Sequence, residues 1–193
     1  TKLEILKATI DHLEQAGYVY VGMDHFARPE DELAVAQRQG TLYRNFQGYS
    51  THSDCDLVAM GVTSIGMVSN SYSQNVRGLE EYYRRIDQGR LPIFRGIALS
   101  TDDLIRRDVI TRLICNFTLP FAEVEQSWGI DFSDYFAADL ATLDEMDADG
   151  LLVRDEREVR VLPRGRLLIR NICMAFDRYL PPVEQQKGFS RVI

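Results

Sequence analysis

The sequence predicts an α/β segment followed by a mainly helical one: the last units of a larger α/β barrel or sheet, and then a C-terminal domain of winged-helix type. Two observations predict this order. Helix-like and strand-like patterns alternate over the first 68 residues, as in parallel α/β folds. Beyond Ser69 the patterns are helical apart from an extended link and one hairpin. We expect the first domain to cover residues 1–75 and the second to cover residues 76–193.

The chain opens with a predicted amphipathic helix over residues 2–16. Apolar residues recur there at helical spacing, and they are Leu3, Leu6, Ile10 and Leu13. Gly17 follows, where glycine commonly ends a helix. We therefore expect a helix that packs through one face.

Two apolar runs, residues 18–23 and 57–68, have the composition of parallel strands covered on both faces. Between them, Pro29 is expected to open a helix through "EDELAVAQRQ", which Gly40 closes. Two such strands cannot cover each other, and the chain starts inside a helical pattern without an initiator Met. We therefore expect a fragment of a larger protein, with a small free-standing α/β protein as the alternative.

The remaining segments predict a helical bundle. Helices are expected in "LEEYYRRIDQG", in "STDDLIRRDVITRLICNF" with Ser100 or Thr101 as N-cap, in "PFAEVEQSWG" and in "DFSDYFAADLATLDEMDADG", while "RLPIFRG" reads as an extended link. "LLVRDEREVRVL" alternates like a hairpin. The last helix presents one apolar face, formed by Leu168, Ile172, Phe176 and Tyr179. Three helices, a hairpin and a helix resemble a winged-helix arrangement.

Winged helices often bind DNA, and four arginines would support that reading here: Arg164, Arg166, Arg170 and Arg178. The segment before them, "DEMDAD", is acidic, and the whole chain carries a net charge of -7. Since nucleic-acid binding depends on clustered cations, we favour a structural domain with solvated arginines and expect no nucleic-acid partner. A non-enzymatic interaction domain of winged-helix type remains an alternative.

The three cysteines, Cys55, Cys115 and Cys173, are widely separated, whereas metal and cluster motifs bring thiolates within a few residues of one another. Reduced, buried thiols of a cytoplasmic protein are the simplest interpretation. No apolar run reaches the roughly 20 residues that span a bilayer, so we expect no membrane contact.

The stretch "GMDHFARP" is the main candidate for a functional site, because it follows a predicted strand and reactive groups gather at such strand ends in parallel barrels. Asp24 would orient His25, Phe26 would supply an apolar wall, and Arg28 would bind a carboxylate. The alternative is structural, with Asp24 capping a turn. A metal site would need Asp24, His25 and His52 to converge, and no His spacing supports that.

Four blocks are similar to the C-terminal part of one family, the oxygen-independent coproporphyrinogen III oxidases (dehydrogenases), which are radical S-adenosylmethionine enzymes of haem synthesis. The blocks are "GMDHFARPEDELAVAQRQGTLYRNFQGYST", "IRRDVITRLICNF", "GRLLIRNICMAFDRYL" and "FSRVI". The resemblance implies a partial (β/α) barrel followed by a helical C-terminal domain. It also implies a reaction in which two propionates of coproporphyrinogen III become vinyl groups, giving protoporphyrinogen IX and carbon dioxide.

The cofactors that the resemblance implies are S-adenosylmethionine and a [4Fe–4S] cluster, together with an electron donor and an acceptor that the sequence does not identify. The cluster motif C-x-x-x-C-x-C is absent here. We therefore expect no catalytic or metal-binding residue in this chain and no turnover by the chain alone. A haem-chaperone relative of the same superfamily is the rival; its C-terminal region lacks the "LICNF" and "LLIRNICM" blocks.

The resemblance also assigns roles to individual residues. The segments "NFQGY" and "GVTSIGMV" match those that hold a second S-adenosylmethionine-sized ligand, which carries this role to Gln47 and Ile65. Tyr49 and His52 are candidates for the wall of the same cavity. We expect all of them to face one opening of the barrel, in a protein that is monomeric.

Overall fold

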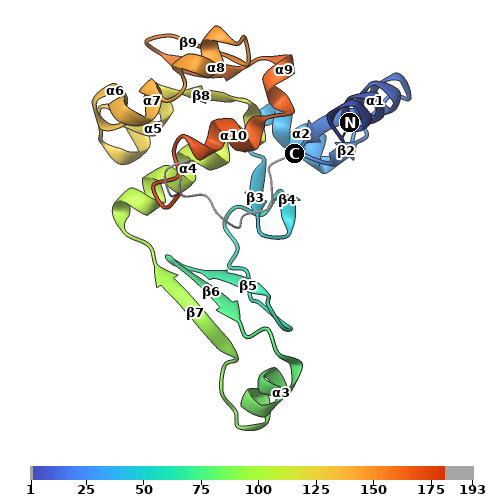
Figure 1. Cartoon of the computed structure of the whole chain (residues 1–193), viewed down its shortest axis with the longest axis vertical. Helices are drawn as coiled ribbons and strands as arrows, with labels where there is room; N and C mark the ends of the chain where they lie inside the picture. Colours follow the sequence, from blue (N-terminus) through green and yellow to red (C-terminus); the bar gives the residue numbers. More distant parts are fainter. Residues whose placement is uncertain (1, 181–193) are drawn as a thin grey trace. The chain divides into compact units, whose positions relative to one another are not determined.

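The computed structural model describes residues 2–180, so the terminal "FSRVI" block lies outside the described residues. Contacts divide the chain into two compact units. The first unit comprises Thr1–Thr51 and Arg106–Ile193, and the second unit comprises His52–Ile105. Each unit is described by itself; Figure 1 labels their helices and strands. The expected domain division after residue 75 stays a prediction.

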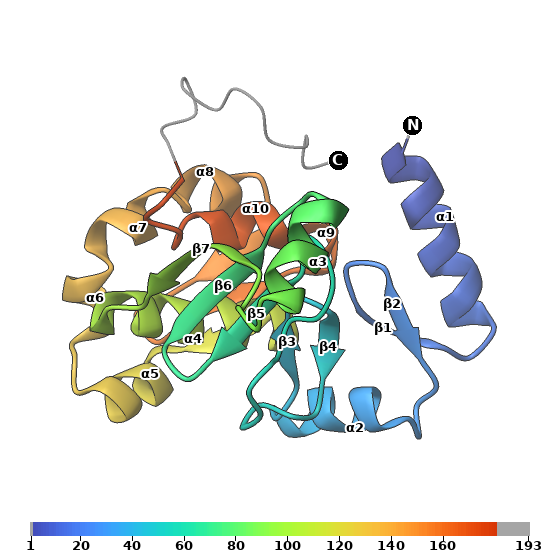
Figure 2. The same ribbon diagram turned by 90° about the horizontal axis from the view of Figure 1, so that it is seen from below.

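The first unit begins with two helices and two short hairpins. These elements are α1 (Lys2–Gln15), β1 (Val19–Gly22), β2 (His25–Ala27), α2 (Glu32–Gln39), β3 (Tyr43–Asn45) and β4 (Gly48–Ser50). Both helices contact β1, and Figure 2 shows α1 beside the β1–β2 hairpin. Gly17 ends α1 at φ 87°, and its N–H donates to the carbonyl of Glu14 at 2.9 Å. The expected N-terminal helix is confirmed.

Helix α2 is also confirmed, but its first residue is not Pro29. The helix begins at Glu32 because the carboxylate of Asp31 accepts a hydrogen bond from the N–H of Leu33 at 2.9 Å. Gly40 closes the helix in the left-handed region, at φ 70°.

The prediction that residues 18–23 and 57–68 form parallel strands is wrong. Every pairing between named strands in residues 2–180 is antiparallel. Strand β1 pairs with β2, so "HFA" of the DHFA stretch is a strand rather than a loop. Only Met23 and Asp24 separate the two strands, and positive φ angles at Gly22 (148°) and Met23 (57°) accommodate the reversal. The apolar composition of β1 reflects burial, since Tyr20 and Val21 are 5% and 0% exposed.

The rest of the first unit combines a three-stranded sheet with short helices. The elements are the Arg106–Asn116 part of α4 (Thr101–Asn116), β8 (Thr118–Pro120), α5 (Phe121–Trp128), α6 (Phe132–Tyr135), α7 (Ala137–Ala141), α8 (Asp144–Ala148), β9 (Leu152–Arg154), β10 (Glu158–Val161), α9 (Pro163–Arg166) and α10 (Ile169–Met174). Strand order is β8–β10–β9. The expected hairpin is therefore confirmed, and β8 adds a third strand to it.

Aromatic side chains from α5, α6, the α6–α7 junction and the segment after α10 pack together in the core of this part. The rings of Phe121 and Phe132 stack at 4.2 Å, and Phe136 lies 4.8 Å from Phe132 and 5.5 Å from Phe176. The helix expected over 131–150 is wrong as a single element, because Phe136 departs from helical geometry at φ -105°, ψ 20° between α6 and α7. The last helix is likewise split at Leu168 (φ -110°, ψ 19°).

The final apolar face is confirmed only in part. Ile172 and Phe176 are fully buried, whereas Tyr179 is 61% exposed.

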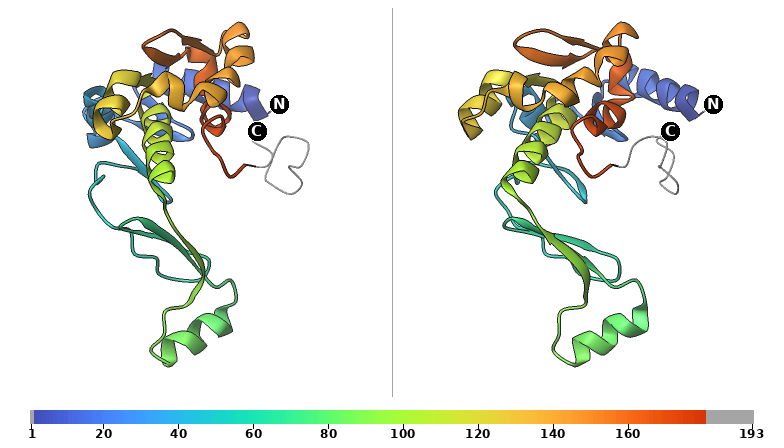
Figure 3. Two further views of the ribbon diagram at one scale, coloured as in Figure 1. Left: turned by 90° about the vertical axis from the view of Figure 1, so that its left-hand side faces the viewer. Right: turned by 60° about the vertical axis from the view of Figure 1, so that its left-hand side comes forward.

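The second unit contains a three-stranded antiparallel sheet, the helix α3 and the first residues of α4. Its elements are β5 (Ile65–Val68), β6 (Ser71–Asn75), α3 (Leu79–Asp87) and β7 (Ile93–Ala98), with strand order β5–β6–β7. Figure 3 shows this sheet in two views, with α3 in the connection between β6 and β7. Helix α3 was expected. The strand predicted over 57–68 is confined to β5, and the predicted link "RLPIFRG" contributes most of β7.

The start of α4, in the second unit, has a reciprocal cap. The Ser100 Oγ accepts a hydrogen bond from the N–H of Asp103 at 3.3 Å, and Asp103 Oδ2 accepts from the Ser100 N–H at 2.8 Å. The helix and its expected Ser100 cap are thus confirmed. Over residues 2–180, no helix combines the length and apolar character that a membrane span requires.

Candidate functional site

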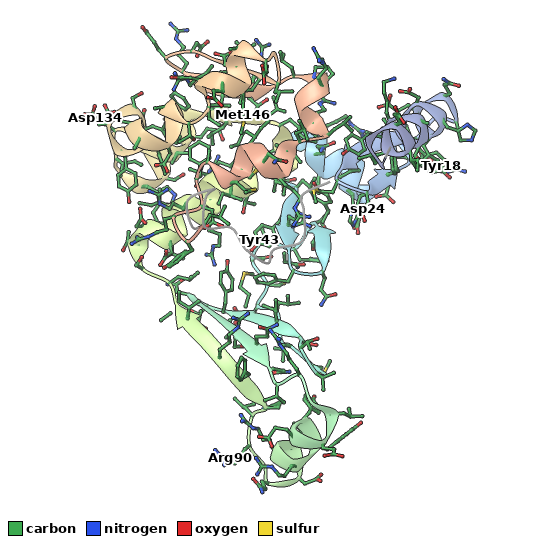
Figure 4. All side chains as sticks on the ribbon, viewed as in Figure 1. Tyr18, Asp24, Tyr43, Arg90, Asp134 and Met146 are labelled. Atoms are coloured by element: carbon green, nitrogen blue, oxygen red, sulfur yellow. The ribbon has the colours of Figure 1, made fainter. Side chains whose placement is uncertain are left out.

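The stretch "GMDHFARP" forms the β1–β2 hairpin and the residues directly after it. Asp24 lies at the turn between the strands, where Figure 4 labels it. The hydroxyl of Tyr20 donates a hydrogen bond to the carbonyl of Met23 at 3.1 Å, which ties the strand to its own turn. The ring of Phe26 lies 5.4 Å from that of Tyr20 across the hairpin. Three of the predicted residues, Asp24, His25 and Phe26, therefore occupy one small structure.

His25 is held between a carboxylate and an aromatic ring. Its Nδ1 lies 2.9 Å from Asp24 Oδ1, but this contact lacks hydrogen-bond geometry, and Nδ1 is a buried atom without a hydrogen-bond partner. Its ring meets the Tyr49 ring edge-on, with centroids 5.1 Å apart and planes at 84°. The His25 side chain is 35% exposed, against 87% for Asp24. The predicted Asp24–His25 pair thus exists as a contact, and Tyr49 contributes to orienting the ring.

The β3–β4 turn, which carries Gln47, lies beside this histidine. A Cβ atom on Gly48 would approach His25 Nε2 to 3.0 Å, so the two hairpins are in close contact there. Gln47 itself is exposed, and its backbone N–H donates to Asn45 Oδ1 at 2.8 Å. The structure therefore brings the turn that carries Gln47 close to His25, while a shared ligand site for the two residues stays a prediction.

Tyr49 is a buried anchor of the site. Its hydroxyl donates a hydrogen bond to the carbonyl of Ile114 on α4 at 3.0 Å. Burial raises the pKa of this phenol well above its usual range. Gly22 makes the close packing possible, because a Cβ atom there would lie 2.3 Å from the Tyr49 hydroxyl oxygen.

The other predicted residues are placed differently. Arg28 is exposed and lies 3.9 Å from Glu30. His52 and Ile65 belong to the second unit, where His52 is exposed and Ile65 is half-buried at the start of β5. The opening that these two residues would share with Gln47 stays a prediction.

Three residues around the end of α4 were not among the sequence candidates for the site: Gln37, Phe117 and Arg166. Gln37 on α2 donates from Nε2 to the carbonyls of Val21 (2.6 Å) and Cys115 (2.8 Å), which joins β1 to α4. Phe117 follows at φ 60°, an uncommon conformation for a bulky residue. The guanidinium of Arg166 lies 4.8 Å from the Phe117 ring centroid.

Arg166 is therefore not the solvated arginine that the sequence suggested, although Arg164, Arg170 and Arg178 are exposed as expected. Arg44, on β3, was also missed, and its guanidinium lies 5.6 Å from the Tyr49 ring centroid. Arg44 stands inside the "TLYRNFQGYS" segment, two residues before Phe46. The only sequence feature that could have identified Arg44 is its position in a block that resembles the family. Arg44 and Arg166 are too far apart in the sequence for any local pattern to connect them.

The residues present do not fit an iron–sulfur cluster. Cys115 and Cys173 are buried, and burial raises the pKa of each thiol to about 12. Cys55 is exposed and lies in the second unit. No group of three or more His, Cys, Asp or Glu side chains able to hold a metal occurs in the part of the chain that the structure describes.

A separate groove lies around the β9–β10 turn and includes none of the predicted site residues. It is lined by Phe121, Ser133, Leu140, Arg154, Asp155, Glu156 and Arg157.

Comparison with known proteins defines first the class and then the family. Residues 99–168 match the family described as HemN C-terminal domain. The fold matches a solved structure of coproporphyrinogen III oxidase (HemN) from Escherichia coli, described as a radical SAM enzyme, with a TM-score of 0.88 and 56% identity over 93% of this chain and 41% of that one. The chain thus has the fold of the C-terminal part of a radical SAM enzyme.

Two curated relatives are oxygen-independent coproporphyrinogen III oxidases. The protein from Escherichia coli (strain K12) is 55% identical over 192 residues, and that from Pseudomonas aeruginosa is 51% identical over 192 residues. Each match covers 100% of this chain and 42% of the relative. Over its whole length the chain is similar to the C-terminal part of oxygen-independent coproporphyrinogen III oxidases, and it spans about two fifths of the length of these relatives. The resemblance found in the sequence is confirmed.

Proposed function

We propose that this chain is the C-terminal part of an enzyme that oxidatively decarboxylates two propionates of coproporphyrinogen III to vinyl groups and so forms protoporphyrinogen IX. The observation that carries this proposal is the 55% identity to the Escherichia coli oxidase across the whole chain. The chain's own role is to shape the ligand cavity. It contains neither the cluster motif nor a cysteine arrangement that would replace it.

S-adenosylmethionine and a [4Fe–4S] cluster, the latter held by residues outside this chain, would supply the radical that removes hydrogen from the substrate. This chain would position the substrate and keep water away. Phe26 offers an apolar wall, and His25, held between Asp24 and Tyr49, offers a fixed ring edge. Arg28, exposed beside Glu30, remains our candidate for binding a substrate propionate.

We further propose that Gln47 and Ile65 contact a second S-adenosylmethionine-sized ligand. Gln47 is exposed in the β3–β4 turn, where its amide can both donate to and accept from an amino-acid group. Ile65 is half-buried at the start of β5 and offers an apolar surface.

The finer features of the fold are also proposals. The order α4, β8, α5 and then the β9–β10 hairpin, with β8 in the same sheet, supports a winged-helix-like C-terminal domain. The position of the match within the longer relatives supports a preceding partial (β/α) barrel. The acidic composition supports a cytoplasmic, monomeric protein without a nucleic-acid partner.

Replacing Gln47 in the full-length enzyme tests the ligand assignment. Loss of one hydrogen bond to a charged ligand group is expected to lower product formation about tenfold in Gln47→Ala. Cluster content and melting temperature should stay unchanged, because the side chain is exposed. Gln39→Ala, at an exposed position on α2, is the matched control. Wild-type turnover and ligand stoichiometry in Gln47→Ala would refute the role.

A further inference from the structure

Two arginines of the first unit have a buried Nε atom without a hydrogen-bond acceptor. Arg106 pairs with Asp139 at 3.0 Å and Arg154 with Asp144 at 2.6 Å. Arg44 and Arg166 are half-buried, and the Nε of each is a buried atom without a hydrogen-bond partner. Among residues 2–180 the only direct contact found for either guanidinium is an aromatic ring.

The two guanidinium groups border the same small region. Arg44 lies over Tyr49 and Arg166 over Phe117, at 5.6 and 4.8 Å from the ring centroids. Both rings pack against one residue: a Cβ atom on Gly22 would lie 2.3 Å from the Tyr49 hydroxyl oxygen and 3.4 Å from the Phe117 ring. Both cation–ring pairs therefore adjoin the β1–β2 hairpin at Gly22.

Other polar atoms without partners occur beside these rings. His25 Nδ1 and Asn116 Oδ1 are both buried without a hydrogen bond, His25 against Tyr49 and Asn116 next to Phe117 in sequence. We call Arg44, Arg166, His25 and Asn116 the arginine cluster. The carboxylate of Asp24 contacts His25 and forms no ion pair with either arginine.

Burying two guanidinium groups without an anion lowers the stability of the fold, and binding of an anion would offset this loss. A guanidinium removed from water loses hydration, and a ring face replaces only part of it. In native structures, buried cationic groups normally find an anion, and guanidinium groups bind carboxylates through two parallel hydrogen bonds. A protein with net charge -7 contains many carboxylates, yet it leaves these two arginines unpaired within the described residues.

We propose that Arg44 and Arg166 form a carboxylate-binding site that receives the acid groups of a bound ligand. Two ligands of the proposed function carry such groups: the propionates of the tetrapyrrole and the methionine carboxylate of S-adenosylmethionine. The identity of these ligands rests on the proposed function, whereas the carboxylate chemistry rests on the two unpaired guanidinium groups.

Binding measurements on the full-length protein test this site. The variants are Arg44→Gln and Arg166→Gln, and the matched control is Arg164→Gln, an exposed arginine on the same helix as Arg166. One arm titrates coproporphyrin III and its tetramethyl ester, followed by fluorescence. The other arm titrates S-adenosylmethionine and its decarboxylated analogue by calorimetry.

The carboxylate ligand of at least one arm should bind about tenfold more weakly to Arg44→Gln and to Arg166→Gln, because a charge-assisted pair is lost. The ester or the decarboxylated analogue should bind all variants equally, and Arg164→Gln should match wild type. The arm that responds identifies the source of the carboxylate. Arg44→Lys and Arg166→Lys keep the positive charge but lack the planar guanidinium, so their affinity for the carboxylate ligand should fall several-fold. These two variants replace a Gln variant that does not fold.

Unchanged affinity for both carboxylate ligands overturns the proposal. A lowered melting temperature without any carboxylate-specific loss also overturns it, since an acid of the protein itself would then be the partner. Product formation by the wild-type enzyme is measured separately. If wild type makes product and the variants bind normally, only the arginine site fails; if wild type makes no product but the variants lose affinity, only the proposed function fails. If wild type binds neither ligand, both fail.

Discussion

At the scale of single residues, the three cysteines show how burial separates groups of identical chemistry. Cys115 and Cys173 lie in the core, and the Sγ of Cys173 donates weakly to the carbonyl of Ile110 at 3.9 Å. Desolvation disfavours the thiolate and raises the pKa of both groups to about 12. Cys55 is exposed. The prediction that the cysteines are buried thiols is confirmed for Cys115 and Cys173 and is wrong for Cys55.

Alkylation should therefore be selective in the native protein. Iodoacetamide at pH 8 is expected to label Cys55 and to leave Cys115 and Cys173 unmodified, because a thiol with a pKa near 12 is almost entirely protonated at that pH. Peptide mass spectrometry measures the outcome, with the urea-unfolded chain as the control in which all three react. Rapid native labelling of Cys115 would show that the core around α4 opens readily.

At the scale of elements, the β1–β2 hairpin is fixed by its fit to Tyr49. Gly22 has a φ of 148° and almost no space for a side chain, whereas Gly40 has a φ of 70° and no atom within 4 Å of the place that a Cβ would occupy. The two glycines therefore separate the cost of backbone conformation from the cost of a clash.

We expect Gly22→Ala to lower the free energy of unfolding by about 3 kcal/mol, through strain and overpacking together. Gly40→Ala should lose only about 1 kcal/mol, since conformation alone is affected. Urea denaturation of both variants gives the comparison. Equal losses would mean that Tyr49 moves aside easily and that the hairpin is not held by this contact.

At the scale of the whole molecule, the placement of the three cysteines argues against an iron–sulfur cluster held by the described part of this chain. Cys55 lies in the second unit, and the other two cysteines are buried in the first. Cluster ligands are thiolates, usually three or four within one motif. The Escherichia coli oxidase that the chain matches is longer, since the match covers 42% of it, and the solved structure of that enzyme is described as a radical SAM enzyme.

Anaerobic reconstitution of this chain with iron and sulfide should leave the visible spectrum without cluster absorption and the iron content near background. The physical reason is that two of the three thiols remain protonated in the core. The full-length protein, treated in parallel, is the positive control. Charge-transfer bands with stoichiometric iron in the isolated chain would contradict this expectation.

The sequence by itself determined the local elements and the family. Residues 2–16, α3, α4 and the β9–β10 hairpin follow from periodicity, glycine stops and caps, which act over a few neighbouring residues. The "GMDHFARP" stretch was recognised as a candidate because its residue types are unusual at a strand end. The sequence also predicts that Asp24 orients His25; the two side chains are in contact, but without hydrogen-bond geometry.

Only the tertiary structure decided how these elements pair and which charges are buried. An apolar run such as 18–23 has the same composition in a parallel strand and in a covered hairpin, so its antiparallel partner depended on the positive φ angles at Gly22 and Met23. In sequence Arg166 resembles its exposed neighbours Arg164 and Arg170, but in the structure its guanidinium lies over the ring of Phe117. Periodicity reports which residues tend to be buried, but the environment of a charge depends on residues distant in sequence, and that is why the arginine cluster was visible only in the fold.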